Sequence, residues 1–235
     1  MPDESLLDNP AWHSLTGPHQ HLAEVRGAAR RYAPDASFAS AVERPWDPQD
    51  PGWADLAALA GAGELVTMTG AAVRPPEGWE RIEGGFGVQL VDIAVDARRD
   101  DEAVRLGPAD VPEILDLVAR TKPGPFLPRT IELGTYVGLR RDGALVALAG
   151  ERMHPLGWTE ISAVCTDERF RGQGLATRLV LDVTHRIRQR GDHPLLHAAE
   201  TNTNAIRLYE AVGFKTRIRT TFVLLRTPLT DRNDA

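Results

Sequence analysis

Apolar residues recur at two different spacings along this chain, and the contrast is clearest after residue 103. Over residues 173–190, apolar side chains return every three or four positions, which predicts a long amphipathic helix that ends at Gly191. Over residues 218–224, apolar and polar side chains alternate, which predicts a strand with one buried face.

The rest of the second half divides into short elements of the same two kinds. We predict further helices over 111–118 and 205–212 and further strands over 104–106, 135–140, 144–152, 160–166 and 195–198. Asp142-Gly143 is a strong hairpin signal, and Asp110 and Glu113 have the spacing of a capping box. Residues 122–129 contain three prolines and should form a loop. This order of elements predicts an α/β fold with a mixed sheet and helices on its faces.

The first half carries weaker patterns. Apolar residues at 22, 25, 29 and 32 favour a helix over 19–33, and a second helix is expected over 53–60. Strands are expected over 65–69 and 88–91. Six of the seven residues 96–102 are charged, which is typical of a linker or an exposed turn. We therefore predict an N-terminal α/β subdomain over 1–103 and a second domain over 104–235.

Composition and charge narrow the class of protein. The chain has 235 residues, a formal net charge of −6 and no long basic run, which argues against a nucleic-acid partner. Cys165 is the only cysteine, so no intramolecular disulfide can form. The N-terminus lacks the features of a signal peptide, and no apolar stretch approaches the roughly 20 residues that span a membrane. We expect a cytoplasmic protein with no membrane partner.

The densest chemical signal is a glycine-bearing turn between a strand and a helix. The strand ends at Val164-Cys165-Thr166, the turn contains Arg171-Gly172-Gln173-Gly174, and the helix opens with Leu175-Ala176-Thr177. The first amide groups of a helix lack intrahelical partners and attract anions, and glycines let a phosphate approach the backbone. Neither a Walker motif nor a dinucleotide fingerprint is present. The alternative is a tight turn whose glycines serve only steric needs.

Two segments together carry a family resemblance. Arg171–Ala176 fits the pattern R/Q-x-x-G-x-G/A, and Asn202–Phe214 fits N-x-x-A-I-x-L-Y-E-x-x-G-F. Both resemble signatures of the GNAT N-acetyltransferase superfamily, over roughly residues 104–235. Residues 162–166 are similar to its glycine-N-acyltransferase-like branch. The resemblance implies a GNAT fold in the C-terminal half, and one interpretation of residues 1–103 is a degenerate half-copy of that fold.

The resemblance also implies a reaction and the residues that carry it. Acetyl-CoA would be the co-substrate, and an acetyl or other short acyl group would pass to a primary amine by direct attack. Backbone groups of Val164, Cys165 and Thr166 would contact the pantetheine arm, and Asn202 would bind the cofactor nearby. The pyrophosphate would lie against Arg171, Gly172, Gln173, Gly174, Leu175, Ala176 and Thr177. The alternative is a catalytically silent, CoA-binding regulatory protein with the same fold.

Acid and base candidates follow from the same chemistry. Tyr209 is the candidate acid that protonates the departing thiolate, because a phenol pKa is well matched to that of a thiol. Glu160 is the leading candidate base, at the position of a catalytic glutamate in the histone-acetylating branch of the superfamily. A carboxylate in an apolar cleft should have a raised pKa. Glu151 and a chain of waters without a dedicated base are the alternatives.

Other reactive residues carry less weight. A nucleophilic role for Cys165 is less favoured than a small buried side chain. His19 and His21 form an H-x-H pair without an evident third ligand, so we expect no metal. We expect loop 122–129, with Phe126 and Leu127, and turn 153–158 to line the cleft for a small-molecule or peptide amine. A homodimer is compatible with the sequence.

Overall fold

One eight-stranded sheet organises the molecule, a computed structural model that describes residues 2–229. This confirms the predicted α/β fold with a mixed sheet. Only β9 and β10 run parallel; every other neighbouring pair is antiparallel. The strands in spatial order are β4 (Leu65–Gly70), β11 (Phe214–Arg226), β5 (Glu80–Asp92), β10 (His193–Ala199), β9 (Trp158–Thr166), β8 (Ala144–Glu151), β7 (Tyr136–Arg141) and β6 (Val104–Leu106).

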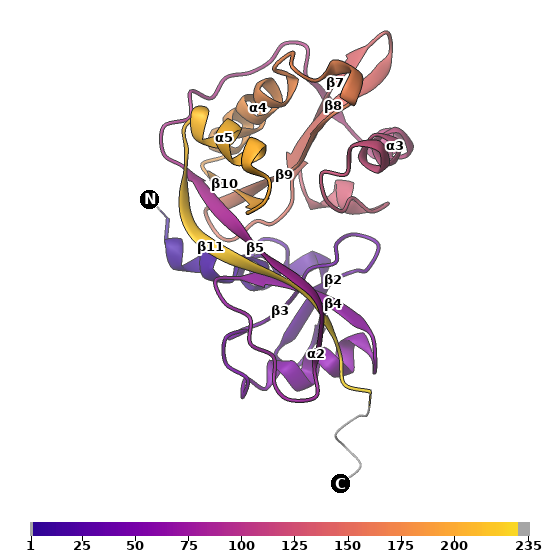
Figure 1. Cartoon of the computed structure of the whole chain (residues 1–235), viewed down its shortest axis with the longest axis vertical. Helices are drawn as coiled ribbons and strands as arrows, with labels where there is room; N and C mark the ends of the chain where they lie inside the picture. The colour runs from indigo at the N-terminus through magenta and orange to yellow at the C-terminus, as the bar shows by residue number, and fades with distance from the viewer. Residues whose placement is uncertain (1, 230–235) are drawn as a thin grey trace.

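Helices cover both faces of this sheet. Figure 1 shows α4 (Leu175–Gln189) and α5 (Thr203–Ala211) on one side of the strands and α3 (Val111–Thr121) on the other. The apolar stripe predicted for α4 is buried in the core that it shares with α5, which explains why this segment is helical. The apolar side chains of α3 are buried against the opposite face, with Tyr136 and Leu148. Each such side chain stabilises the fold by about 1.5–3 kcal/mol through burial.

The prediction of a helix over 19–33 is wrong. The segment contains a short 3-10 turn followed by a hairpin of β1 (Ala23–Arg26) and β2 (Ala29–Tyr32), with β3 (Ser40–Val42) beside it. Gly27 has a φ of 47°, a left-handed conformation that glycine adopts easily, and the carboxylate of Asp55 accepts a hydrogen bond from the Ala28 amide at 2.7 Å. Apolar residues at this spacing fit either element, and the glycine turn decides for the hairpin.

The other helix and the two strands predicted for the first half are confirmed. The helix expected over 53–60 is α2 (Gly52–Ala60), and the strands expected over 65–69 and 88–91 lie within β4 and β5. A further short helix, α1 (Pro10–Leu15), packs against β3 and β4. Figure 1 shows α2 at the end of the molecule remote from α4 and α5.

The sheet crosses the predicted domain boundary. β4 and β5 precede residue 103, yet both pair with β11, the last strand of the chain. In Figure 1, β5 and β11 run side by side from the part that holds α4 and α5 into the part that holds α2. The division at residue 103 stays a prediction, while the strand pairing makes the two parts share one sheet.

The predicted capping box at Asp110 and Glu113 is wrong. The Asp110 carboxylate instead accepts a hydrogen bond from the Gly107 amide at 2.9 Å, because a 3-10 turn over Pro108–Asp110 precedes the helix. Glu113 accepts a hydrogen bond from the Leu145 amide at 2.6 Å and forms an ion pair with Arg140. Asp110 also forms an ion pair with Arg140 of β7, so both acids tie the start of α3 to the β7–β8 hairpin.

Candidate active site

Two neighbouring parallel strands separate in the middle of the sheet. β9 and β10 pair from His193 opposite Trp158 to Leu196 opposite Ile161, and their pairing stops there. β9 nevertheless continues to Thr166 and β10 to Ala199. The two strand ends therefore diverge. Beyond Ile161 and Leu196, the backbone groups of β9 no longer pair with those of β10.

A bulge in β9 marks the point of separation. Ala163 has a φ of 55°, an uncommon conformation for a residue with a side chain, and the β8–β9 register shifts between Leu148 and Gly150. Bulges redirect the backbone locally. Here the bulge lies immediately before Val164, the first residue of the predicted cofactor-binding strand segment.

The glycine turn has the geometry expected for an anion site. Gly172 and Gly174 have φ values of 77° and 71°, and a Cβ atom built on either would meet no atom within 4 Å. Both glycines thus leave open space beside the backbone rather than relieve a steric clash. Gly174 is the N-cap of α4, so the free amides and the positive dipole end of a 15-residue helix start here.

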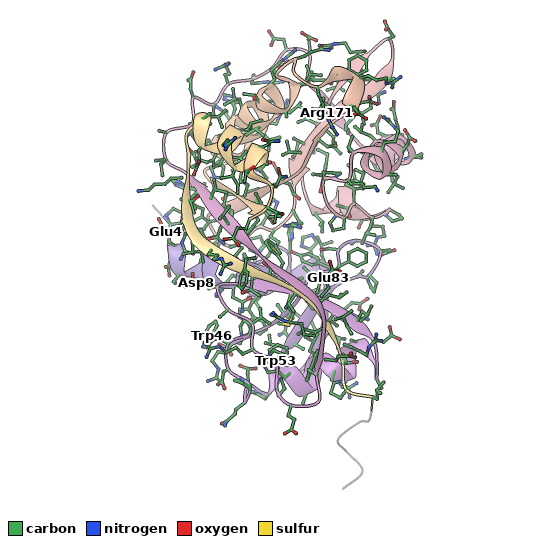
Figure 2. The ribbon with its side chains drawn as sticks, in the orientation of Figure 1. Glu4, Asp8, Trp46, Trp53, Glu83 and Arg171 are labelled. Atoms are coloured by element: carbon green, nitrogen blue, oxygen red, sulfur yellow. The ribbon has the colours of Figure 1, made fainter. Side chains whose placement is uncertain are left out.

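One cavity of about 490 Å³ brings nearly all of the predicted cofactor residues together. It lies between the end of β9, the start of α4, the C-terminal end of α3 and α5. Figure 2 shows Arg171 in this region of the molecule. The predicted residues that line it are Val164, Cys165, Thr166, Arg171, Gly172, Gly174, Leu175, Ala176, Thr177, Asn202 and Tyr209. Gln173 is exposed and is not among the lining residues.

Arg171 is the cation of the turn that remains available to a ligand. Its neighbour Arg169 forms an ion pair with Asp167, which Arg120 also binds, and these contacts hold the pKa of Asp167 well below its usual range. Arg178, one turn into α4, is paired with Asp100. Arg171 has no acidic partner in the described part of the chain, so its charge faces the cavity uncompensated.

Asn202 and Tyr209 reach the cavity from α5. Asn202 caps this helix, and its side-chain oxygen accepts a hydrogen bond from the Ala205 amide at 3.2 Å, which leaves the side-chain NH₂ group for a ligand. Tyr209 is buried against Phe214, and burial raises its pKa to about 12. The phenol therefore carries its proton throughout the neutral range.

Glu160 has a different environment from the predicted one. It is fully buried, does not line the cavity, and lies beside Arg152 and His197. Burial alone would raise its pKa, but the charge of Arg152 and the hydrogen bonds from both neighbours outweigh burial and lower the pKa to about 2. The expectation of a raised pKa is wrong, because the strand pairing brings two partners to this carboxylate.

The remaining candidates, Glu151, Cys165 and Phe126, are all buried. Glu151 is buried and accepts hydrogen bonds from Arg190 at 2.8 Å and from the Thr135 amide at 3.0 Å. Cys165 lines the cavity wall, and burial raises the pKa of its thiol to about 11, which disfavours a thiolate nucleophile. Phe126 is buried against Tyr136 and lines none of the described cavities.

Thr121, Phe170, Ala205 and Leu208 line the cavity without having been predicted from the sequence. Lys122 and Pro123 also line it, and both belong to loop 122–129, which was expected at the acceptor cleft. Lys122 has a left-handed φ of 51°, which ends α3 and directs the chain away. The proline-rich loop gave a local signal for Lys122 and Pro123, but only tertiary packing brings it to this cavity.

His19 of the H-x-H pair serves the N-terminal packing, whereas His21 is exposed. His19 lies 2.9 Å from the Tyr32 hydroxyl and stacks against His154, with ring centroids 4.5 Å apart. Burial lowers the pKa of His19 to about 3.

Across residues 2–229, no group of three or more His, Cys, Asp or Glu side chains could hold a metal ion. Within the same residues, no helix is long and apolar enough to cross a membrane.

Comparison with known proteins includes a match that combines 38% identity with coverage of nearly the whole chain. A solved structure from Novosphingobium aromaticivorans DSM 12444, assigned as an acetyltransferase of the GNAT family, is 38% identical, with a TM-score of 0.85. The match covers 93% of this chain and 97% of that one. The family model described as FR47-like protein matches residues 136–223, from β7 into β11.

A more distant solved structure agrees in fold, and two curated relatives match a third of the chain in sequence. A GCN5-related N-acetyltransferase from Kribbella flavida is 18% identical, with a TM-score of 0.59, over 95% of this chain and 98% of that one. Two mycothiol acetyltransferases match 32% of this chain: that of Thermomonospora curvata is 37% identical over 75 residues, and that of Thermobispora bispora 37% over 83. The matches cover 25% and 28% of those proteins, so the chain spans about a quarter of the length of the curated relatives it matches.

Proposed function

Because this chain belongs to the GNAT family of acetyltransferases, we propose that it transfers an acetyl group from acetyl-CoA to a primary amine by direct attack in a ternary complex. The observation that carries the proposal is the single cavity into which the end of β9, the glycine turn, Asn202 and Tyr209 all face. The strand end and Asn202 suit the pantetheine, the glycine turn suits the diphosphate, and Tyr209 suits the departing thiol.

The residues present fit acetyl-CoA. The open space beside Gly172 and Gly174, the amide groups at the start of α4 and the unpaired Arg171 suit a diphosphate. The NH₂ group of Asn202 and backbone groups of Val164 suit the amides of pantetheine. When bound, acetyl-CoA supplies an acetyl group that its thioester activates toward an amine.

The protein's own groups then handle protons and charge. Tyr209 keeps its proton at neutral pH because burial raises its pKa, and its hydroxyl can donate that proton to a thiolate. Backbone amides freed where β9 leaves β10 can stabilise negative charge on a carbonyl oxygen. Glu160 and Glu151 are engaged by arginines, so we propose that water carries the ammonium proton to solvent.

The finer parts of the proposal concern the branch of the family, the transferred group and the location in the cell. The similarity to the glycine-N-acyltransferase-like branch depends on residues 162–166 alone. The matches to mycothiol acetyltransferases extend over a third of the chain and support acetyl as the transferred group. The acceptor is left to be argued from the structure. A cytoplasmic location remains part of the proposal.

Calorimetry and a thiol-release assay test this function together. We expect acetyl-CoA to bind with measurable heat and amines from a mixed panel to accelerate release of the CoA thiol. Binding without release on any amine would favour the alternative of a catalytically silent, CoA-binding regulatory protein. Absence of any heat with acetyl-CoA would overturn the proposal.

A further inference from the structure

The chain contains only two lysines, Lys122 and Lys215, although it has 27 basic Lys and Arg residues in all. Lys122 lines the same cavity as Tyr209, whereas Lys215 is exposed on β11 and lines none of the described cavities. Arginine keeps its proton in proteins, but a lysine amine can lose its proton and act as a nucleophile. Lys122 therefore brings a primary amine of the protein itself to the candidate active site.

The end of α3 holds Lys122 against the strand segment that we assign to the pantetheine arm. The Lys122 amide donates a hydrogen bond to the Val118 carbonyl at 2.8 Å, which fixes the backbone of this residue at the C-terminal cap. The preceding side chain, Thr121, lies within hydrogen-bonding reach of the Cys165 thiol on β9. Figure 1 shows α3 and α5 on either side of β9. Lys122 therefore approaches the end of β9 from the side opposite to Tyr209.

The surroundings of the Lys122 amine leave it free to react. No acidic side chain lines the cavity, and within residues 2–229 neither an ion pair nor a side-chain hydrogen bond engages this amine. The acids near the end of α3, Asp116 and Asp167, are both paired with Arg120. An amine and a thioester held in one cavity react within one complex, so the transfer requires no further substrate.

On the basis of the proposed function, we propose that Lys122 is a self-acetylation site, to which bound acetyl-CoA transfers its acetyl group within the same molecule. The Lys122 ammonium first gives one proton to water. The amine nitrogen then forms a bond to the acetyl carbon and loses its second proton to water, while the carbon–sulfur bond breaks. The sulfur receives the Tyr209 proton, which solvent replaces. The products are free CoA and an acetyl amide on Lys122.

Self-acetylation changes the electrostatics of the cavity in which it occurs. Lys122 and Arg171 are the two basic side chains among the residues that line this cavity. Acetylation removes the charge of a lysine. Once Lys122 is modified, Arg171 is therefore the one lining side chain that still offers a positive charge to the anionic co-substrate.

Peptide mass mapping of the unchanged protein tests this site. Incubation with acetyl-CoA, without any added amine, should acetylate Lys122 roughly tenfold faster or more than Lys215, which reports the uncatalysed reaction of an exposed lysine. The first-order rate constant should be independent of protein concentration, because one molecule holds both the amine and the thioester. Equal rates at the two lysines, or a rate constant that rises in proportion to protein concentration, would overturn this inference.

Two variants link the modification to the site and to its chemistry. Lys122→Arg keeps the charge but removes the acylable amine, so the fast-reacting peptide should disappear from the map. Tyr209→Phe should slow acetylation of Lys122 by the same factor as thiol release to added amines and should leave Lys215 unchanged. If Tyr209→Phe slowed thiol release to added amines but left the rate at Lys122 unaltered, the transfer would occur outside the proposed site and the inference would fail.

Protection by free CoA gives a reading that does not depend on turnover. Acetic anhydride acetylates both lysines chemically, and saturating CoA should protect Lys122 while leaving Lys215 as reactive as before. Equal modification of Lys122 with and without CoA, in a sample whose calorimetry shows that CoA binds, would overturn this inference. If added amines release thiol while Lys122 stays unmodified, only this inference fails. If acetyl-CoA does not bind, the proposed function fails and this inference falls with it.

Discussion

The Arg152 guanidinium holds the Glu160 carboxylate with two hydrogen bonds, from Nε to Oε2 at 2.9 Å and from Nη2 to Oε1 at 2.5 Å. His197 Nδ1 lies 2.8 Å from the same carboxylate, whose side chain is 1% exposed. A buried charge with two partners is suited to fixing the geometry of β8, β9 and β10 where the strands separate. The contribution of this carboxylate to stability can be measured.

Glu160→Gln should destabilise the protein by about 3 kcal/mol, because the partly buried Arg152, whose side chain is 24% exposed, loses its counter-charge. The control is Glu132→Gln, which breaks the exposed Arg129–Glu132 pair and should cost about 0.5 kcal/mol or less. Urea unfolding measures both. A cost for Glu160→Gln no larger than that of the control would contradict the structural role.

The same carboxylate predicts a pH dependence of stability. Its pKa is lowered from 4.5 to about 2 on folding, so the folded state gains stability from the ionised form. This contribution should be complete above pH 4.5 and be lost as the pH falls from there toward 2. Unfolding free energies of the parent chain and of Glu160→Gln should therefore converge over that range. Parallel curves would count against the assignment.

Tyr209→Phe should reduce turnover on the order of 100-fold and leave acetyl-CoA affinity unchanged, because only the proton donor is removed. The packing against Phe214 is retained, so the melting temperature should stay close to that of the parent. Thiol release and calorimetry on the same sample give the two readings. Unaltered turnover would remove Tyr209 from the mechanism.

Arg171→Ala should weaken acetyl-CoA binding by roughly 10-fold or more, because a charge-assisted hydrogen bond to a phosphate is lost. Arg169→Ala is the matched control from the same turn, since Arg169 is already paired with Asp167. We expect a smaller change in affinity there. Titration calorimetry with acetyl-CoA and with free CoA measures both, and equal losses would mean that Arg171 holds no special position.

Gly174→Ala should abolish most acetyl-CoA binding, since its new methyl group would stand in the open space beside the start of α4. Gly191→Ala is the control: Gly191 has a comparable φ of 87°, also has open space, and lies at the other end of the same helix. Both substitutions should cost about 1–2 kcal/mol in stability through backbone strain. A similar affinity for both variants would show that the strain, and not the space, matters.

The sequence alone predicted the architecture of the second half correctly because its signals are local. The period of apolar residues sets which face of α4 is buried, and Asp142-Gly143 closes the β7–β8 hairpin through its own turn geometry. The same holds for the glycine turn, where backbone conformation at Gly172 and Gly174 follows from the residue type. Eleven of the twelve predicted cofactor residues accordingly face one cavity, the exception being Gln173.

Local patterns failed where two elements share one signature or where the partner is distant. Residues 19–33 carry a spacing that fits a helix, yet the turn at Gly27 and the contact with Asp55 select a hairpin. Glu160 is the second case, because its pKa depends on Arg152, eight residues away, and His197, 37 residues away. The effect of a partner's charge on a pKa depends on the distance between the two groups in space, and a local sequence pattern does not contain that distance.

What the sequence determined by itself is therefore the fold class and the glycine turn before α4, since both follow from short-range backbone preferences and side-chain periodicity. Only the tertiary structure decided the neighbours of Glu160, the convergence of α3 and α5 on one cavity, and the pairing of β5 with β11. The last joins an early segment of the chain to its final strand. Strand order joins residues far apart in the chain, and hydrogen bonding between strands is satisfied or left open only once that order is set.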